Sequence, residues 1–270
     1  MYSKRKALCF YALLAPQIWG RAQHQSLQAV TIPRMAFTTN GQQMMDFSDV
    51  RAMVFDMDGT LLNTEHVIIQ AASQTLAHMG YAALPVGYQM PNMFGTAADL
   101  MADVLLERGH TLSASTKQQA GVWFEQFYAQ HPAGSAPLYD GAVDWLHAAK
   151  AQGIALGVCT NKQYDLAIKG LQAAGILELF AAVTGRDTYG IAKPAPEPLL
   201  HTLAKLQVRA QEAVFFGDTH ADAACAQAAG VRFAWFTSGF GTAQVRDFAQ
   251  VLAFADYRTL LGAGPLKPKA

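Results

Sequence analysis

"VFDMDGTLL", residues 54–62, places two aspartates, Asp56 and Asp58, between an apolar stretch and a Gly-Thr turn. The stretch "VRAMVFDMD" to which they belong begins as a short, continuous apolar run, which is typical of a strand buried on both faces of a parallel sheet. Two like charges so close together at the end of a buried strand are unfavourable unless another group compensates them. The stretch therefore predicts a central strand with a charged site at its end.

Similar apolar runs recur along the chain, and helical patterns lie between them. The runs are "IALGVCTN" (154–161), "AAVTG" (181–185), "AVFFGD" (213–218) and "RFAWFTSG" (232–239). The helical patterns cover 141–153, 163–175, 196–207 and 220–230, and three of them end at a glycine suited to a helix C-cap. Strands alternating with helices predict an α/β fold, a Rossmann-like parallel sheet with helices on both faces.

Residues 65–136 interrupt this alternation. Three helical patterns, at 65–80, 96–109 and 116–130, follow one another with no convincing strand between them. The chain returns through "HPAGSAPLYDG" (131–141), whose Pro132, Gly134 and Pro137 suit a linker. We therefore expect an α/β core formed by 50–64 and 137–264, with an inserted all-helical cap at 65–136.

The N-terminal 49 residues are expected to be an extension of this core. Residues 1–45 contain five basic residues and no acidic residue. They are compatible with a targeting segment, a disordered tail or a start codon upstream of the true one. The apolar run near their beginning is too short to span a bilayer.

The overall composition points to a small-molecule partner. Lys plus Arg balance Asp plus Glu at 20 each, so no basic field favours nucleic acid or a membrane surface. Cys9, Cys159 and Cys225 are widely spaced, which favours a reducing, cytoplasmic location over a disulfide framework.

Polar residues follow the ends of the predicted strands. Because ligands of open α/β sheets bind beyond the carboxyl ends of the strands, these residues are expected to converge on one edge. They are Asp56, Asp58, Thr160, Asn161 and Asp218, joined by Lys193 before Pro194 and by Asp222. Four carboxylates repel one another unless a cation lies among them, and all-oxygen ligands with room for waters and phosphate favour Mg²⁺. Asp56 could then attack phosphorus, and Asp58 could serve as general acid and base.

These motifs resemble those of the haloacid dehalogenase superfamily of phosphohydrolases. "DMDGT" (56–60), Thr160, Lys193 and "GDTHAD" (217–222) match its four motifs in order. The resemblance implies Mg²⁺ held by the Asp56 side chain, the Asp58 backbone carbonyl and Asp218, with Asp222 in support. It implies that Thr160 and Lys193 hold the phosphoryl group, while Asn161 either joins them or shapes the loop. The helical insertion resembles the family's cap, which closes over the site and excludes water.

The overall pattern is most similar to that of phosphoglycolate phosphatases. The resemblance implies a magnesium-dependent phosphatase, monomeric or homodimeric, that hydrolyses a small phosphorylated metabolite (phosphoglycolate-like or a sugar phosphate) through an aspartyl-phosphate. A phosphomutase of the β-phosphoglucomutase type and a non-catalytic binding module on the same fold are the alternatives. A phosphonatase would need a cap lysine, and Lys117, the only lysine between residues 62 and 136, looks exposed.

Two further regions, one in the predicted cap and one beside Asp218, contain polar residues that need an interpretation. In the cap, "PNMFGTAADL" (91–100) has the form of a loop followed by a helix, in which Gly95, Thr96 and nearby amides could bind an anion and set specificity. An ordinary helix N-terminus explains the same pattern. His220 lies beside Asp218, but we expect it to cap its helix or face solvent.

Overall fold

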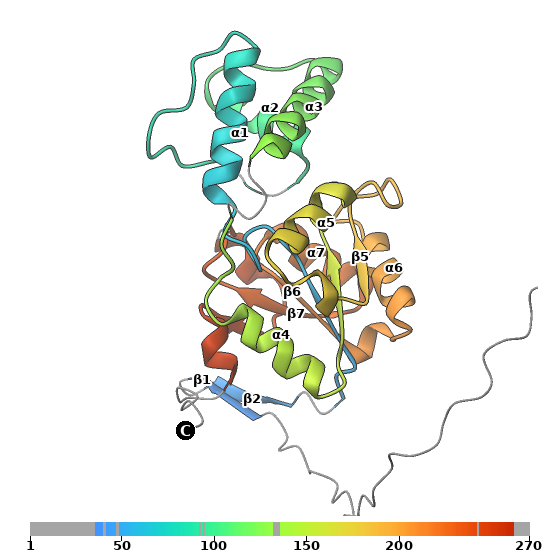
Figure 1. Cartoon of the computed structure of the whole chain (residues 1–270). Helices are drawn as coiled ribbons and strands as arrows, with labels where there is room; N and C mark the ends of the chain where they lie inside the picture. Colours follow the sequence, from blue (N-terminus) through green and yellow to red (C-terminus); the bar gives the residue numbers. More distant parts are fainter. Residues whose placement is uncertain are drawn as a thin grey trace, which may run out of the picture. The chain divides into compact units, whose positions relative to one another are not determined.

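The computed structural model describes residues 36–39, 42–46, 49–91, 93, 95–131, 136–241 and 243–261. The core is a six-stranded, wholly parallel sheet with the order β5-β4-β3-β6-β7-β8 (Figure 1). Its strands are β3 (Ala52–Phe55), β4 (Ala155–Cys159), β5 (Ala182–Thr184), β6 (Ala213–Gly217), β7 (Arg232–Phe236) and β8 (Leu252–Phe254). The predicted α/β fold is confirmed.

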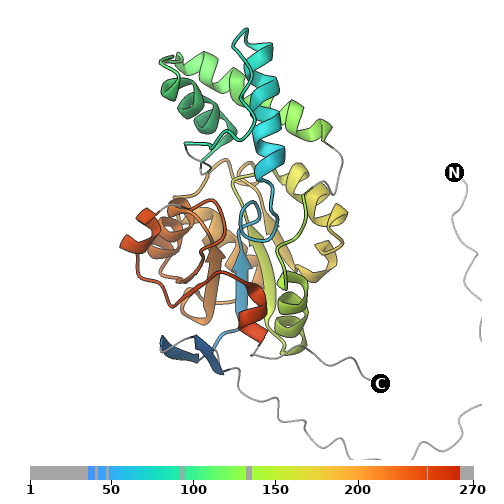
Figure 2. The same ribbon diagram turned by 90° about the vertical axis from the view of Figure 1, so that its left-hand side faces the viewer.

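Helices cover both faces of the sheet. This explains why the sequence of the central strand, β3, is continuously apolar. Met53 and Phe55 belong to the buried cluster on one face, and Ala52 and Val54 belong to the cluster on the other. Side chains alternate between the faces of a strand, so a strand covered on both sides has no solvent-facing position. Helices α4 (Ala142–Ala151) and α5 (Tyr164–Ala173) supply residues to the first cluster, and α6 (Glu197–Leu206) and α7 (His220–Ala229) to the second (Figure 2).

The five predicted strands and the four predicted core helices are all present, but three strands were not foreseen. β8 is only three residues long, too short for its pattern to stand out. β1 (Ala36–Thr39) and β2 (Gln42–Asp46) form an antiparallel pair within the predicted N-terminal extension. Residues 1–35 of that extension, and Pro132 and Gly134 of the predicted linker, lie outside the described residues. Four 3-10 helices complete the described elements: Leu177–Leu179, Ala210–Glu212, Ala243–Asp247 and Tyr257–Leu261.

The predicted cap range contains three helices, α1 (Glu65–His78), α2 (Ala97–Glu107) and α3 (Ala114–Gln130). They share a buried cluster of their own, to which Leu76, Met101 and Phe124 belong. The two chain segments that connect this range to the core are hydrogen-bonded to each other. Asn63 N donates to Pro137 O at 2.8 Å, and Tyr139 N donates to Leu61 O at 3.0 Å.

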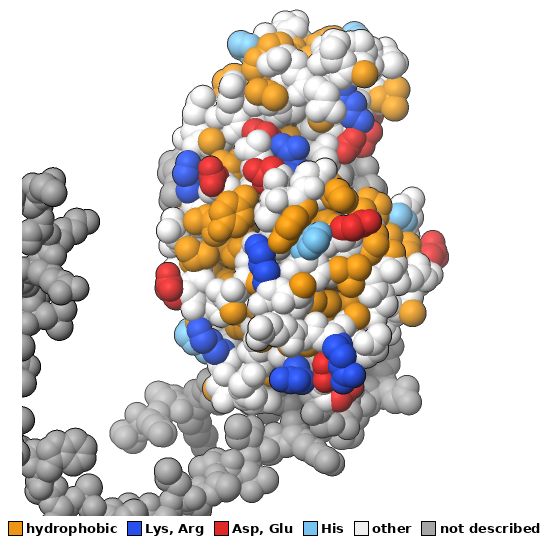
Figure 3. All heavy atoms as spheres, turned by 90° about the vertical axis from the view of Figure 1, so that its right-hand side faces the viewer, with side chains coloured by type: hydrophobic (Ala, Val, Ile, Leu, Met, Phe, Trp, Pro, Cys, Tyr) orange, Lys and Arg blue, Asp and Glu red, His pale blue; other side chains and the backbone are white. Residues whose placement is uncertain are grey.

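The described surface agrees with the balanced charge of the sequence. On the face at the right of Figure 1, acidic, basic and hydrophobic side chains are interspersed (Figure 3). Among the described residues, no helix combines the length and the apolar character needed to cross a membrane.

Gly121 allows α3 to pack closely on α2. A larger side chain at this position therefore tests the packing of these two helices. A Cβ at Gly121 would lie 2.9 Å from the Cβ of Ala98, closer than real Cβ atoms approach. We expect Gly121→Val to lower the free energy of unfolding by about 1–3 kcal/mol through overpacking, measured by urea denaturation. Val122→Ala, at a neighbouring position that is 46% exposed, is the matched control and should change little. Equal stability of the two variants would contradict this packing.

Candidate active site

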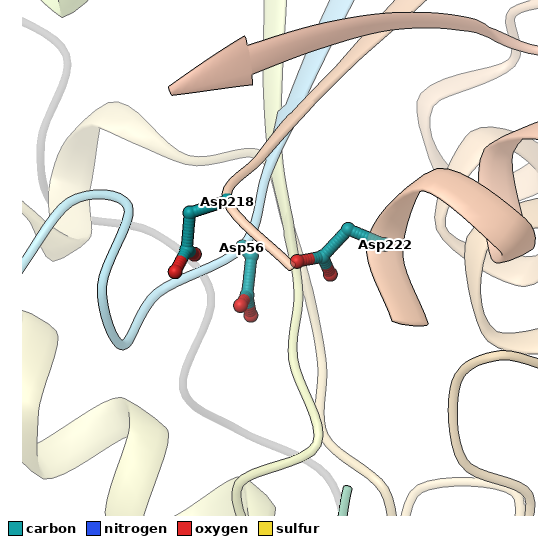
Figure 4. A group of neighbouring side chains, drawn as sticks. All are labelled: Asp56, Asp218 and Asp222. Atoms are coloured by element: carbon teal, nitrogen blue, oxygen red, sulfur yellow. The ribbon is translucent and has the colours of Figure 1, made fainter. Parts of the chain in front are cut away.

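Three neighbouring strands bring the predicted site residues to one edge of the sheet. Asp56 follows β3, Thr160 follows β4 and Asp218 follows β6, and β3 pairs with both β4 and β6. At β3 the strand order runs to β4 and β5 on one side and to β6, β7 and β8 on the other, so this edge is the switch point where such sheets bind ligands. Figure 4 shows Asp56, Asp218 and Asp222 gathered there.

Lys193 lies between two of these carboxylates. Its Nζ is 2.8 Å from Asp56 Oδ1 and 2.6 Å from Asp222 Oδ1, and all three side chains are buried. The other oxygen of Asp222 accepts hydrogen bonds from the amide and the hydroxyl of Thr219, at 2.9 and 2.6 Å, in the capping box that begins α7. Asp222 is therefore an anchor that holds the Lys193 ammonium against Asp56.

The turn formed by Gly59 and Thr60 positions the Asp218 carboxylate. Thr60 Oγ1 donates to Asp218 Oδ1 at 2.6 Å, and the amide of Phe240 donates to Asp218 Oδ2 at 2.7 Å. Gly59 has φ +82°, and a Cβ there would lie 2.5 Å from Asp218 Oδ2. Gly59 therefore supplies both the left-handed backbone and the space that this carboxylate occupies.

The three buried carboxylates fit a bound cation. One oxygen each of Asp56, Asp218 and Asp222 lie within 4.8 Å of one another. Asp56 Oδ1 is paired with Lys193, and no described residue donates a hydrogen bond to the other oxygen of Asp56. Burial, opposed by Lys193, raises the pKa of Asp56 to about 7, and burial together with Asp222 and Asp56 raises the pKa of Asp218 well above its usual value. Ionising this cluster therefore requires more positive charge than Lys193 supplies.

The three carboxylates are not equally available to a metal. Both oxygens of Asp222 are already engaged, one by Lys193 and one by Thr219, whereas in Asp56 only Oδ1 is engaged, by Lys193. This geometry favours Asp56 as a ligand. Both oxygens of Asp218 also accept hydrogen bonds, from Thr60 and Phe240, so Asp218 as a second ligand stays a prediction. The Asp58 carbonyl as a third ligand stays a prediction.

Asp58 is paired with a residue that sequence reasoning missed. Lys162 Nζ lies 2.8 and 2.6 Å from the two oxygens of Asp58 and 4.0 Å from the centre of the Tyr128 ring on α3. Burial lowers the pKa of Lys162, but Asp58 and Tyr128 more than offset this, so the pKa rises and the ammonium persists. The available signal was the position of Lys162 two residues after Thr160, on the loop that follows a predicted strand.

Thr160 and Asn161 have different surroundings. The Thr160 side chain lies at the pocket and accepts a hydrogen bond from the amide of Lys162 at 3.2 Å. The Asn161 amide instead binds the backbone of Lys193, donating to its carbonyl at 3.0 Å and accepting from its N–H at 2.8 Å. The Asn161 side chain thus fixes the loop that carries Lys193, and its role in phosphate binding stays a prediction.

A pocket joins these residues to the predicted cap. Its wall combines polar core residues with side chains of α1, α2 and α3, and includes Asp56, Asp58, Thr160, Lys162, Lys193, Ile68, Leu100, Phe124, Glu125 and Tyr128. Gly95 and Thr96 also line it, but the Thr96 amide already donates to Asp99 at 3.0 Å, as in an ordinary capping box. Their role in specificity stays a prediction.

Lys117 and His220, which the sequence analysis argued against as site residues, do not line the pocket. Lys117 Nζ pairs with Asp99 at 2.6 Å and is not among the residues that line the pocket. His220 begins α7, and its ring packs edge-on against Phe248 with 5.0 Å between ring centres.

Comparison with known proteins agrees with this geometry. Residues 53–236 match the family model of the haloacid dehalogenase-like hydrolases. A phosphoglycolate phosphatase of Cereibacter sphaeroides is 35% identical, over 72% of this chain and 88% of its own length. One from Rhodospirillum rubrum is 34% identical, over 78% of this chain and 89% of its own length.

Among solved structures, a predicted phosphoglycolate phosphatase from Haemophilus somnus has the same fold. Its TM-score is 0.69 at 24% identity, and the match covers 79% of this chain and 97% of that protein. The chain therefore belongs to the haloacid dehalogenase-like hydrolase family and is one of its phosphatases.

Proposed function

We propose that this enzyme hydrolyses a small phosphomonoester with the aid of Mg²⁺ and through an aspartyl-phosphate on Asp56. The observation that carries the proposal is the position of Asp56. Its buried carboxylate directly follows the central strand and lines the pocket, and only one of its two oxygens is paired, with Lys193. Such a carboxylate is placed to act as a nucleophile toward a phosphoryl group in the pocket.

Lys193 supports this attack by charge. It lies 2.8 Å from Asp56, so its ammonium reduces the repulsion between the carboxylate and an incoming phosphoryl group. Asp222 keeps the lysine in place from the opposite side. Thr160, at the end of β4, offers a hydroxyl to the same region of the pocket.

Asp58 is the proposed general acid and base. Its carboxylate forms an ion pair with Lys162, whereas Asp56 and Asp222 form ion pairs with Lys193. In the first step it gives a proton to the leaving oxygen as the ester bond to phosphorus breaks. In the second step it removes a proton from the water that hydrolyses the aspartyl-phosphate.

Mg²⁺ would be held by the side chains of Asp56 and Asp218 and by the Asp58 carbonyl, with Asp222 in support. When bound, it neutralises charge on the phosphoryl oxygens and keeps the crowded carboxylates ionised. The fit rests on the buried cluster, on the raised pKa values of Asp56 and Asp218, and on the oxygen of Asp56 that is not paired with Lys193.

The substrate proposed is phosphoglycolate or another small phosphorylated metabolite, such as a sugar phosphate. The names of the curated relatives from Cereibacter and Rhodospirillum support this class. The complete set of Asp56, Asp58, Lys193 and Asp218 argues against a non-catalytic module. Cys159 and Cys225 are free and buried, which supports the proposed cytoplasmic location.

The nucleophile is tested by Asp56→Asn. We expect the wild-type protein to release phosphate from p-nitrophenyl phosphate in the presence of Mg²⁺, and the variant to lose activity by a factor on the order of 10³ or more. Asp165→Asn, at an exposed position in the first turn of α5, is the matched control. Equal activity of wild type and Asp56→Asn would refute the assignment.

The metal is tested by thermal unfolding with and without Mg²⁺. At a Mg²⁺ concentration about 100 times Kd, binding should add about 2.7 kcal/mol to the free energy of unfolding. The pKa of Asp56 without metal is about 7, so protons compete with the ion below that pH. The Mg²⁺-dependent rise in Tm should therefore be larger at pH 8 than at pH 6. Asp218→Asn should abolish the rise and Asp165→Asn should preserve it; a rise unaffected by Asp218→Asn would place the ion elsewhere.

A further inference from the structure

Two loops at the carboxyl edge of the sheet are joined into one surface. They are residues 160–164, after β4, and residues 185–188, after β5, here called the β4–β5 platform. Arg186 N donates to Lys162 O at 3.1 Å, and Tyr164 N donates to Asp187 Oδ1 at 2.7 Å. A Cβ at Gly185 would lie 2.6 Å from Tyr164 N, so glycine permits this close approach. The two loops therefore keep Lys162 and Arg186 in a fixed relation.

Helix α3 contacts this platform through two side chains one turn apart. Glu125 forms an ion pair with Arg186, and the ring of Tyr128 lies 4.0 Å from Lys162 Nζ. Residues three apart on a helix lie on the same face, so both contacts form together. Glu125 and Tyr128 also line the pocket that contains Asp56 and Asp58.

Lys162 links Tyr128 to Asp58, the proposed general acid. Lys162 has a flexible four-carbon stem, and its ammonium can reach Asp58 only in a subset of rotamers. The ring of Tyr128 packs on the ammonium while Asp58 binds it at 2.6 and 2.8 Å, so the lysine lies between the two. The lysine side chain is only 7% exposed, which leaves it little room to move while the ring is present.

We propose that Tyr128, held over the platform by the Glu125–Arg186 ion pair, is a positioning residue for the Asp58 carboxylate and acts on it through Lys162. The inference rests on the proposed function, because it assumes that Asp58 is the general acid. It assigns α3 a part in orienting the acid, in addition to enclosing the pocket.

The dependence of kcat/KM on the leaving group distinguishes a role in positioning Asp58 from a purely structural role of Tyr128. An alkoxide is a poor leaving group and needs a proton from Asp58, whereas p-nitrophenolate is a stable anion and departs without one. The kcat/KM value reports the first irreversible step, here formation of the aspartyl-phosphate. Misplacing Asp58 should therefore reduce kcat/KM for alkyl phosphates more than for p-nitrophenyl phosphate, and Asp58→Asn gives the reference pattern.

The experiment compares Tyr128→Leu with Tyr128→Phe in the full chain. The alkyl substrate is the one turned over fastest by wild type among 2-phosphoglycolate, glycerol phosphates and hexose phosphates. We expect Tyr128→Leu to lower its kcat/KM about tenfold, part of the 10²–10⁴ that a general acid supplies, and to lower that of p-nitrophenyl phosphate less than about threefold. Tyr128→Phe keeps the ring over Lys162 but removes the hydroxyl that also interacts with it, so its loss on the alkyl substrate should be smaller than that of Tyr128→Leu. Val122→Ala, on the exposed side of α3, is the matched control.

A second route uses the ion pair and does not depend on the folding of Tyr128→Leu. Glu125→Gln and Arg186→Gln should each cause the same selective loss on the alkyl substrate. The double variant should lose no more than either single variant, because both remove one contact. Additive losses, equal losses on the two substrates, or no loss would each overturn the inference.

The experiments distinguish a failure of the proposed phosphatase function from a failure of the proposed role of Tyr128. An active wild-type enzyme with unselective losses in these variants overturns only the role of Tyr128. A wild-type enzyme that releases phosphate from neither substrate class overturns the proposed function and this inference with it.

Discussion

The burial of three aspartates, with a fourth half-buried beside them, at one edge of a parallel sheet is the constraint on which this site depends. Asp56, Asp218 and Asp222 lie close enough to share a cation, and Asp58 follows two residues after Asp56. Desolvation and mutual repulsion raise the pKa of Asp56 and Asp218, so the cluster is ionised only when positive charge is brought to it. Much of the surrounding structure supplies or positions that charge.

Two buried lysines divide the acids into groups with different chemistry. Lys193 joins Asp56 and Asp222, and Lys162 joins Asp58 alone. A carboxylate that attacks phosphorus must stay ionised, whereas one that exchanges protons must alternate between two forms. In the proposed mechanism these two roles fall on neighbouring aspartates that have different lysine partners. Asp56 and Asp58 share the loop after β3, whereas their lysine partners come from the segments after β5 and β4.

The fold was predictable because each central strand is covered on both faces and is therefore apolar throughout. The runs that end at Asp56, Thr160 and Asp218 show this directly, and their order fixed the edge at which the acids meet. Lys162 and Tyr128 were missed because their roles are tertiary. Tyr128 looks like any aromatic residue of an amphipathic helix until α3 is placed over the loop after β4. The pairing of Asn161 with the Lys193 backbone was likewise beyond sequence reasoning, since 32 positions separate the two residues.

The place where the helical insertion leaves the core explains how α3 can affect an acid on another loop. Asp58 lies three residues before Leu61, whose carbonyl accepts the Tyr139 N–H where the two connecting segments pair. A backbone hydrogen bond from Gly59 N to Leu62 O, 2.8 Å long, closes the turn between the acid and this pairing. Asp58 is thus fixed by its backbone near the connection to α1 and by its carboxylate to Lys162 beneath α3. The orientation of this proposed general acid therefore depends on how α1, α2 and α3 are placed relative to the core loops.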